Sequence, residues 1–357
     1  MRHRLAADLS FAVPGDLETL TGGYVYDRRL AAALTRAGWS IEVLAWAPSF
    51  PHPSAADRAA AAASLAALSD RSLVLIDGLA FGVLPELAEA EASRLRLVAL
   101  VHHPLSLEPE LSPEERARLK QSEQRALAAT LGVIATSETT AETLIRDYSV
   151  RPDRLAVAKP GTDPAPFARG SGLGVRGPHI LSVGTLTPRK GHDLLIEALA
   201  RISDLSWTCT IAGSLTRSPE TTSALRASIA ANRLGERIRL AGEIADLGSL
   251  YDSADLFVLA SRHEGYGMVF AEALQRGLPV IGTTAGAIPE VVPPSAGLLV
   301  PPNDARLLAD ALRQLVADAG TRRRLAAGAR AAAADLPRWE ETAQKVSVFL
   351  RASKSTS

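Results

Sequence analysis

Two glutamates eight positions apart, Glu264 and Glu272, are the side chains best suited to chemistry in this sequence. Glu264 precedes the glycine turn Gly265-Tyr-Gly267, and Glu272 lies about one turn into a helix predicted to start near Met268. Carboxylates accept hydrogen bonds from sugar hydroxyls, and the free N–H groups of a helix start bind anions such as a diphosphate. The segment therefore predicts a site for a sugar linked to a diphosphate. The alternative for Glu272 alone is a favourable interaction with the helix dipole.

A second segment, Ile180 to Gly191, reads as a strand, a glycine turn and a helix start. It lacks the G-x-G-x-x-G spacing of a dinucleotide-binding turn. Lys190 lies where a cation can neutralise a diphosphate leaving group, because charge builds up on the phosphate as it departs. The alternative for Arg189 and Lys190 is a solvated helix start.

Two histidines, His102 and His103, follow the predicted strand Leu97–Val101. Ligands of parallel sheets bind at the carboxyl ends of the strands, so both side chains are candidates for contact with a sugar, and His102 is favoured because it comes first. Glu108 could orient one of the rings. A purely structural histidine is the alternative for each, and His263 is interpreted as a loop residue.

Apolar strand-like runs alternate with amphipathic stretches along the whole chain, which is typical of α/β folds with parallel sheets. In the first half we predict strands at 41–46, 73–77, 97–101 and 132–136, and helices at 24–37, 55–67, 113–129 and 140–148. In the second half we predict strands at 179–183, 207–212, 238–241, 255–260 and 279–282, and helices at 190–202, 221–234, 246–254, 268–275, 305–315 and 339–352.

Between these halves, residues 159–166 and 170–178 are rich in Gly and Pro, as expected of a linker. The same doubly wound, Rossmann-like architecture is therefore predicted twice. We place one domain at 1–165, a second at 166–336, and a last helix in 337–357 that returns to the first domain.

The segment from Glu264 to Glu272 resembles the Glu-x7-Glu motif of the retaining family 4 glycosyltransferases, which have the GT-B fold, with two Rossmann-like domains facing a cleft. The resemblance runs from Gly22 to about Trp339 and is strongest after residue 178. It implies that Glu264 contacts the donor sugar, that residues 266–269 hold sugar and phosphate, and that Glu272 binds the ribose. The first domain would then face the acceptor and the second would hold the nucleotide-sugar.

Several further segments resemble the same family. Lys190 matches its phosphate lysine, but Thr185 stands where the family often has arginine, and Arg189 could supply that charge. Weaker matches are found at 212–214, 241–244, 250–251, 285–290 and 297–304. The implied catalytic residues are His102, His103, Arg189, Lys190 and Glu264; the implied donor-binding residues are Gly22, Gly23, Gly184, Thr185, Gly213, Ser214, Ile244, Gly265, Tyr266, Gly267, Met268, Val269 and Glu272. For Gly22 and Gly23, a helix-capping turn is the alternative.

The composition narrows the range of binding partners expected for the protein. The 357 residues carry 39 basic and 39 acidic side chains, so overall charge does not favour nucleic acid or an anionic membrane, and the scattered arginines do not support peripheral membrane docking. The N-terminus does not read as a signal peptide and no run is long enough for a spanning helix. The single cysteine, Cys209, lies in an apolar run and is predicted to be a buried thiol, which fits a cytoplasmic protein.

No Asp-x-Asp, His-x-x-x-His or paired-Cys spacing predicts a metal, and no cofactor is expected, because a nucleotide-sugar would be a substrate. The sequence thus predicts a metal-independent, retaining hexosyltransferase with a UDP-sugar as the favoured donor, GDP-mannose next, and an unidentified sugar, lipid-linked or small-molecule acceptor. One alternative is an inactive nucleotide-sugar-binding protein or partner subunit. The other is an epimerase or phosphorylase of the same fold, against which the Glu264/Glu272 spacing counts.

Overall fold

The computed structural model describes residues 7–172 and 177–355 and divides the chain into two compact units. One unit is Met1–Gly161 with Pro337–Ser357, and the other is Thr162–Leu336. The division falls after Gly161, whereas the sequence interpretation placed it after residue 165. The last helix belongs to the first unit.

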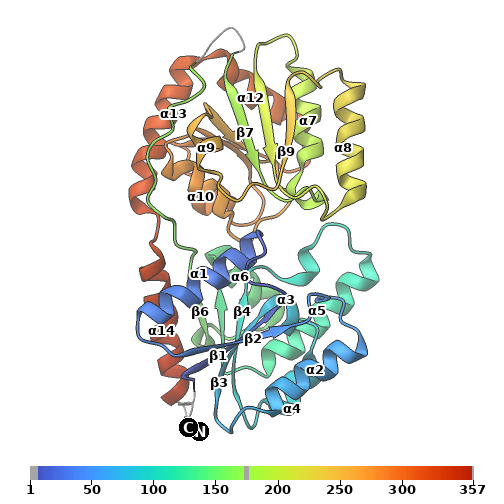
Figure 1. Ribbon diagram of the computed structural model, residues 1–357, viewed down its shortest axis with the longest axis vertical. Coiled ribbons are helices and arrows are strands. Elements are labelled where there is room, and N and C mark those ends of the chain that lie inside the picture. The colour runs from blue at the N-terminus through green and yellow to red at the C-terminus, as the bar shows by residue number, and fades with distance from the viewer. Residues whose placement is uncertain (1–6, 173–176, 356–357) are drawn as a thin grey trace. The chain divides into compact units, whose positions relative to one another are not determined.

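The first unit is built on a six-stranded parallel sheet with the strand order β2-β1-β3-β4-β5-β6 (Figure 1). The order reverses between β1 and β3, and ligands of open α/β sheets bind at such a reversal, outside the carboxyl ends of the strands. The strands are β1 (Leu9–Pro14), β2 (Ile41–Trp46), β3 (Leu73–Asp77), β4 (Arg96–Val101), β5 (Gly132–Ala135) and β6 (Leu155–Val157).

Helices connect these strands, and the last helix of the chain packs against the first one and against β6. Trp39 and Ser347 join α14 to the rest of the unit by a buried hydrogen bond of 2.9 Å. The helices are α1 (Gly22–Arg36), α2 (Ala55–Ala66), α3 (Gly78–Phe81), α4 (Pro85–Glu91), α5 (Pro113–Ala128), α6 (Glu138–Tyr148) and α14 (Trp339–Ser355).

The second unit has its own six-stranded parallel sheet, with the order β12-β11-β10-β7-β8-β9. Here the order reverses between β7 and β10, which are hydrogen-bonded neighbours although far apart in sequence. The strands are β7 (His179–Val183), β8 (Thr208–Ala212), β9 (Ile238–Gly242), β10 (Leu256–Val258), β11 (Val280–Thr283) and β12 (Gly297–Val300).

The helices of the second unit surround this sheet (Figure 1). Two apolar clusters fill the unit, one containing residues of α7 and α12 and the other residues of α10 and α11. The helices are α7 (His192–Arg201), α8 (Pro219–Ala231), α9 (Gly248–Asp252), α10 (Met268–Gln275), α11 (Ile288–Val291), α12 (Ala305–Ala317) and α13 (Ala319–Ala332).

Most predicted elements are present with small shifts at their ends. The structure also contains elements that were not predicted from the sequence, namely β1, β6, α3, α4, α11, β12 and α13. The helix predicted from residue 190 begins at His192, because Pro188–Lys190 form a 3-10 turn and Gly191 has left-handed backbone angles. Cys209 is buried as predicted, and burial raises the pKa of its thiol to about 12. No helix in the described residues is long and apolar enough to cross a membrane.

Candidate functional site

The loops that follow β7 and β10 meet at the strand-order reversal of the second sheet. The backbone N–H of Arg262, after β10, donates to the carbonyl of Arg189, after β7, at 2.8 Å. The guanidinium of Arg262 also pairs with Asp193 in the first turn of α7. These contacts fix the two loops to each other and place their polar side chains together.

The centre of this site is a buried ion pair between Lys190 and Glu264. The Lys190 Nζ donates to Glu264 Oε1 at 2.7 Å, and the Ser261 hydroxyl donates to the same oxygen at 2.6 Å. The Lys190 side chain is 15% exposed and that of Glu264 is 6% exposed. The two residues singled out in separate sequence segments therefore lie in direct contact.

Arg189 joins this pair. Its Nη1 lies 3.6 Å from Glu264 Oε2 and donates to the carbonyl of His263 at 3.1 Å. Thr185, where a family arginine was expected, lies in the turn directly after β7. Arg189 thus brings a second cation to the glutamate, a contact that the sequence interpretation did not predict, while His263 contributes a backbone carbonyl.

These two cations control the ionisation of Glu264. Burial alone would raise its pKa, but the charge of Lys190, that of Arg189 and the hydrogen bonds from Lys190 and Ser261 together lower the pKa to about 2. Glu264 is therefore a carboxylate over the whole physiological range. It suits the role of a fixed acceptor and does not suit that of a proton donor.

The backbone of Glu264 is held by the loop after β11. The N–H of Ala287 donates to the Glu264 carbonyl at 3.0 Å. Gly286 has φ +58°, and a Cβ there would lie 2.1 Å from the Glu264 carbonyl oxygen. Only glycine fits this approach, so the segment Ala285–Glu290, a weak match in the sequence, acts as the support of Glu264.

The helix after the glycine turn, α10, begins at Met268 as predicted. Its N-cap is Gly267, whose φ of +93° is left-handed, and the free N–H groups of the first turn are the anion-binding feature expected there. Gly265 and Tyr266 precede this N-cap and are buried, and Val269 follows Met268 in the first turn.

Glu272 lies one turn into α10 and binds a partner that the sequence did not identify. The Tyr251 hydroxyl donates to Glu272 Oε2 at 2.9 Å. Burial raises the pKa of Glu272, and this hydrogen bond opposes that rise. Tyr251 thereby orients a half-buried carboxylate that is able to accept hydrogen bonds from a diol.

Three glycines line the carboxyl ends of neighbouring strands in this unit. The N–H of Gly184, after β7, donates to Ala212 O at 2.9 Å, and the N–H of Gly213, after β8, donates to Gly242 O at 2.9 Å. A Cβ on Gly184 would touch the Lys190 stem at 3.4 Å. Ser214 accepts a backbone hydrogen bond from Leu186 N, and Ile244 follows β9. The predicted donor-binding residues of this unit thus gather along one sheet edge.

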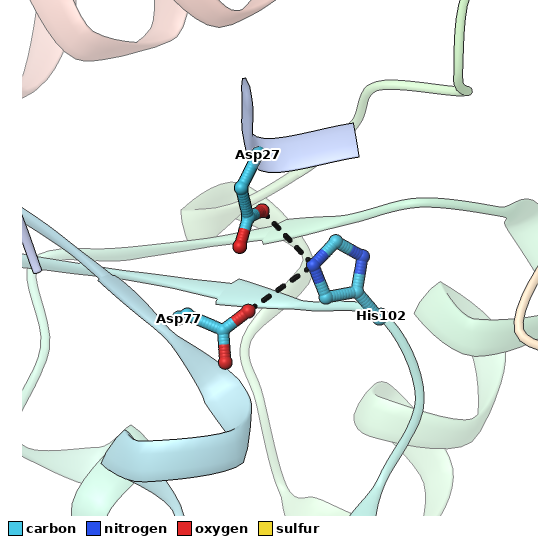
Figure 2. A group of neighbouring side chains, drawn as sticks. All are labelled: Asp27, Asp77 and His102. Atoms are coloured by element: carbon cyan, nitrogen blue, oxygen red, sulfur yellow. Dashed lines mark hydrogen bonds and ion pairs between the residues drawn. The ribbon is translucent and has the colours of Figure 1, made fainter. Parts of the chain in front are cut away.

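In the first unit, His102 binds two buried carboxylates. Its Nε2 lies 3.1 Å from Asp27 Oδ1 and 3.2 Å from Asp77 Oδ2 (Figure 2). Asp77 is the last residue of β3 and Asp27 lies in α1, which follows β1, so both flank the strand-order reversal of this sheet. The prediction for His102 found its place at the end of β4, but it did not find these partners.

The other residues predicted for a site in the first unit, His103, Gly22 and Gly23, lie close to His102 in the sequence or in space. His103 Nε2 lies 2.7 Å from Glu108 Oε1, which confirms Glu108 as the residue that orients a ring. Gly22 and Gly23 are the first two residues of α1, and the N-cap, Thr21, makes no side-chain capping bond. Gly23 lies against the His102 ring, because a Cβ there would be 3.5 Å from its Cδ2.

The sequence missed Asp27, Asp77, Ser261 and His192, and it did not predict the contact of Tyr251 with Glu272. Their signals were weak: the first two lie 50 positions apart and become neighbours only through the sheet. The sequence has no local metal-ligand spacing, yet Asp27, Asp77 and His102 offer three ligand atoms within 4.8 Å of one another. His192 is buried at the start of α7, and its two ring nitrogens have no partner among the described residues.

Comparison with solved structures settles the architecture. Sucrose-phosphate synthase from Thermosynechococcus elongatus superposes with a TM-score of 0.81 at 22% identity, covering 96% of this chain and 98% of that one. The Anabaena protein HepE, solved in complex with UDP and glucose, superposes with a TM-score of 0.77 at 21% identity, covering 97% and 100%. Residues 21–166 match the model Glycosyltransferase Family 4, and residues 167–332 match the model Glycosyl transferases group 1. The fold is the GT-B fold of glycosyltransferases.

Curated sequences match over shorter stretches. The D-inositol 3-phosphate glycosyltransferase of Xylanimonas cellulosilytica is 33% identical over 268 residues, which cover 70% of this chain and 63% of that protein. The enzyme of the same name from Nocardioides sp. is 32% identical over 266 residues, covering 68% and 58%. The matched part of this GT-B chain thus spans about three fifths of the length of these relatives.

Proposed function

We propose that this protein is a retaining glycosyltransferase that moves a hexose from a nucleotide-sugar, with UDP-hexose favoured, to an acceptor without a metal ion. The observation that carries the proposal is the buried pair of Lys190 and Glu264, 2.7 Å apart, at the strand-order reversal between β7 and β10. A carboxylate that can accept hydrogen bonds from a sugar and a cation that can bind a phosphate lie together in this site.

The groups present match the charges that such a transfer develops. The bond from the anomeric carbon to the diphosphate breaks, and negative charge builds on the departing oxygen. Lys190, Arg189 and the N–H groups at the start of α10 would stabilise that charge. Lys190 would bring its positive charge to the phosphate while its ammonium group pairs with Glu264.

Each glutamate has a separate task in this proposal. Glu264, ionised by its two cations, would accept hydrogen bonds from hydroxyls of the donor sugar. Glu272, oriented by Tyr251, would accept from the ribose hydroxyls. This division follows the family pattern carried by the spacing of the two residues.

Retention needs no protein base in the mechanism that we favour. The acceptor oxygen attacks the anomeric carbon on the face that the diphosphate leaves, and its proton passes to the departing phosphate oxygen. The low pKa of Glu264 supports this route, because a permanently ionised residue paired with Lys190 and Arg189 is a poor proton acceptor.

The choice of a UDP-sugar rests on a structural neighbour. HepE was solved with UDP and glucose and, separately, with UDP-glucose. The shared fold makes a uracil nucleotide the first candidate for this chain. The acceptor of the proposed reaction is not specified by these groups.

A thermal-shift screen against UDP-, GDP- and ADP-sugars tests the proposal, because a ligand that binds the native state raises its melting temperature. We expect one nucleotide class, UDP first, to raise the melting temperature. The best donor is then offered with a panel of acceptors, and the anomeric configuration of the product is read by NMR. Inverted product would refute retention, and absence of any shift would refute the nucleotide-sugar site. Binding without any transfer would instead favour a non-catalytic nucleotide-sugar-binding protein.

A further inference from the structure

The His102 ring is enclosed by the first turns of α1 and by the end of β3. Asp27 and Asp77 both reach its Nε2, Gly23 lies against its Cδ2, and the edge of Tyr26 meets it with the ring centroids 5.1 Å apart at 80°. Figure 2 shows the second ring nitrogen on the side facing away from both carboxylates. The ring is therefore held in one orientation, with Nε2 bound by the two carboxylates and Nδ1 directed away from them.

The backbone of His102 is held as well. Its carbonyl accepts hydrogen bonds from the hydroxyls of Thr136, at 3.1 Å, and Thr140, at 3.5 Å. Both threonines belong to the segment that follows β5. Main chain and side chain are thus fixed by contacts from three parts of the unit, which exceeds what a surface histidine requires.

Asp27 and Asp77 are buried, and buried carboxylates reduce the stability of the fold unless they pair with a cation. Asp27 is 1% exposed and Asp77 is 4% exposed, and Asp27 Oδ2 is buried without a hydrogen-bond partner among the described residues. Burial of carboxylates is unfavourable unless they pair with a cation. Of the residues that contact them here, His102 is the one able to supply that cation.

We infer that Asp27 and Asp77 are positioning residues that hold His102 as a doubly protonated ring, with its Nδ1–H presented as a fixed hydrogen-bond donor to an oxygen of a sugar substrate. Because Nε2 faces two acceptors, it carries a proton. The remaining question is the state of Nδ1, which is an acceptor in the neutral ring and a donor in the cation.

The electrostatics support the cation. Burial alone would lower the pKa of His102, but the charge of Asp27, its hydrogen bond and the corresponding effects of Asp77 outweigh burial and raise the pKa to about 10. Burial and the charge of Asp77 raise the pKa of Asp27, whereas the hydrogen bond and charge of His102 lower that of Asp77 in spite of its burial. Asp77 is then the carboxylate that stays ionised as the counter-ion of His102, and Asp27 is the carboxyl that takes up a proton more readily.

The identity of the group that receives this donor rests on the proposed function, but the state of the ring does not. We therefore test the ring in the free protein first, by NMR of protein labelled with 15N-histidine between pH 6 and pH 9. The His102 signal is assigned by its loss in His102→Gln. We expect wild-type His102 to stay doubly protonated at pH 8, and the ring in Asp27→Asn to be mostly neutral there because its midpoint falls from about 10 to about 7, by roughly three units.

The matched kinetic readout is the pH profile of the transfer. We expect wild-type kcat to be flat from pH 6 to pH 8.5, whereas that of Asp27→Asn is near wild type at pH 6 and falls up to about tenfold per unit above its new midpoint. Asp77→Asn provides a second variant with the same expected direction. Glu123→Gln is the control, because Glu123 is a buried carboxyl of the same unit that hydrogen-bonds Leu105 N and does not contact His102.

A neutral wild-type ring at pH 8, or an unchanged His102 midpoint in Asp27→Asn, would overturn the inference. So would stoichiometric binding of Zn²⁺ or Mg²⁺ that is lost in Asp27→Asn, since the three groups would then be metal ligands. If the ring behaves as expected but no nucleotide-sugar is bound or turned over, the proposed function fails and the positioning role stands.

Discussion

Lys190 and Glu264 form an ion pair of 2.7 Å in which both side chains are largely buried, although 74 positions separate them in the sequence. The pair links the loops after β7 and β10, the neighbouring strands at which the strand order reverses. Its cation is therefore a structural partner of Glu264 and, in the proposed function, the group that would meet a departing phosphate.

Replacement of the lysine separates these two roles. In Lys190→Ala we expect the transfer rate to fall by about 10² to 10³, because a fixed donor to the developing charge is lost. We also expect unfolding to be easier by roughly 3 kcal/mol, since Glu264 stays buried with Arg189 as its remaining cation. Arg306→Ala, which removes an exposed cation of the same unit, should leave both values near wild type. Full transfer by Lys190→Ala would remove the lysine from the proposed mechanism.

The low pKa of Glu264 predicts how stability depends on pH. Its native pKa of about 2 lies below its ordinary value of 4.5, so its contribution is complete above about pH 4.5 and is lost as the pH falls through 2. Urea unfolding at pH 6 and pH 3 compares wild type with Glu264→Gln. We expect the wild-type advantage at pH 6 to shrink by about 2 kcal/mol at pH 3. Parallel pH dependence in the two proteins would show that the carboxylate is not held ionised.

Tyr251 is expected to matter for nucleotide binding through Glu272. Tyr251→Phe removes the 2.9 Å hydrogen bond and should reduce stability by about 1 kcal/mol. Because the hydrogen bond holds down the pKa of Glu272, its loss should weaken nucleotide binding more at pH 5.5 than at pH 8. Isothermal titration at the two pH values measures this. Tyr148→Phe loses a buried hydroxyl contact to Ser106 in the other unit, so equal effects on nucleotide affinity in the two variants would refute the role of Tyr251.

Gly286 is expected to be a sensitive glycine of the site, because it lies against the backbone of Glu264. A Cβ there meets the Glu264 carbonyl at 2.1 Å, so Gly286→Ala must displace the backbone of that residue. We expect a loss of more than about 2 kcal/mol together with reduced transfer. Gly38→Ala is the control for left-handed backbone alone, since φ there is +92° and nothing lies within 4 Å of the added Cβ. Chemical denaturation of both variants should show the larger loss for Gly286→Ala.

The sequence carried the parts of this site that depend on local pattern. Glu264, Gly267 and Met268 lie in one continuous strand–turn–helix, so spacing alone placed the helix start. Lys190 lay in a second such segment. Their contact required knowing that β7 and β10 are neighbours, which depends on strand order rather than on any local pattern.

The missing parts are those formed by tertiary contacts between distant segments. Asp27 lies on a helix whose polar residues read as solvated, and Asp77 reads as the end of a strand. Only the parallel pairing of β1, β3 and β4 brings both of them to His102. Tyr251 was noted as a weak match, but its hydroxyl reaches Glu272 from another helix, which no spacing rule anticipates.

Titration of the protein with its best nucleotide-sugar by calorimetry, in wild type and in Glu272→Ala, tests the nucleotide-sugar site most directly. We expect wild type to bind one equivalent and the variant to bind at least about tenfold more weakly, a loss of about 1.4 kcal/mol or more. Melting temperatures of the two proteins, measured without ligand, show whether the variant is folded. Equal affinity in a folded Glu272→Ala would contradict the assignment of Glu272 to the donor.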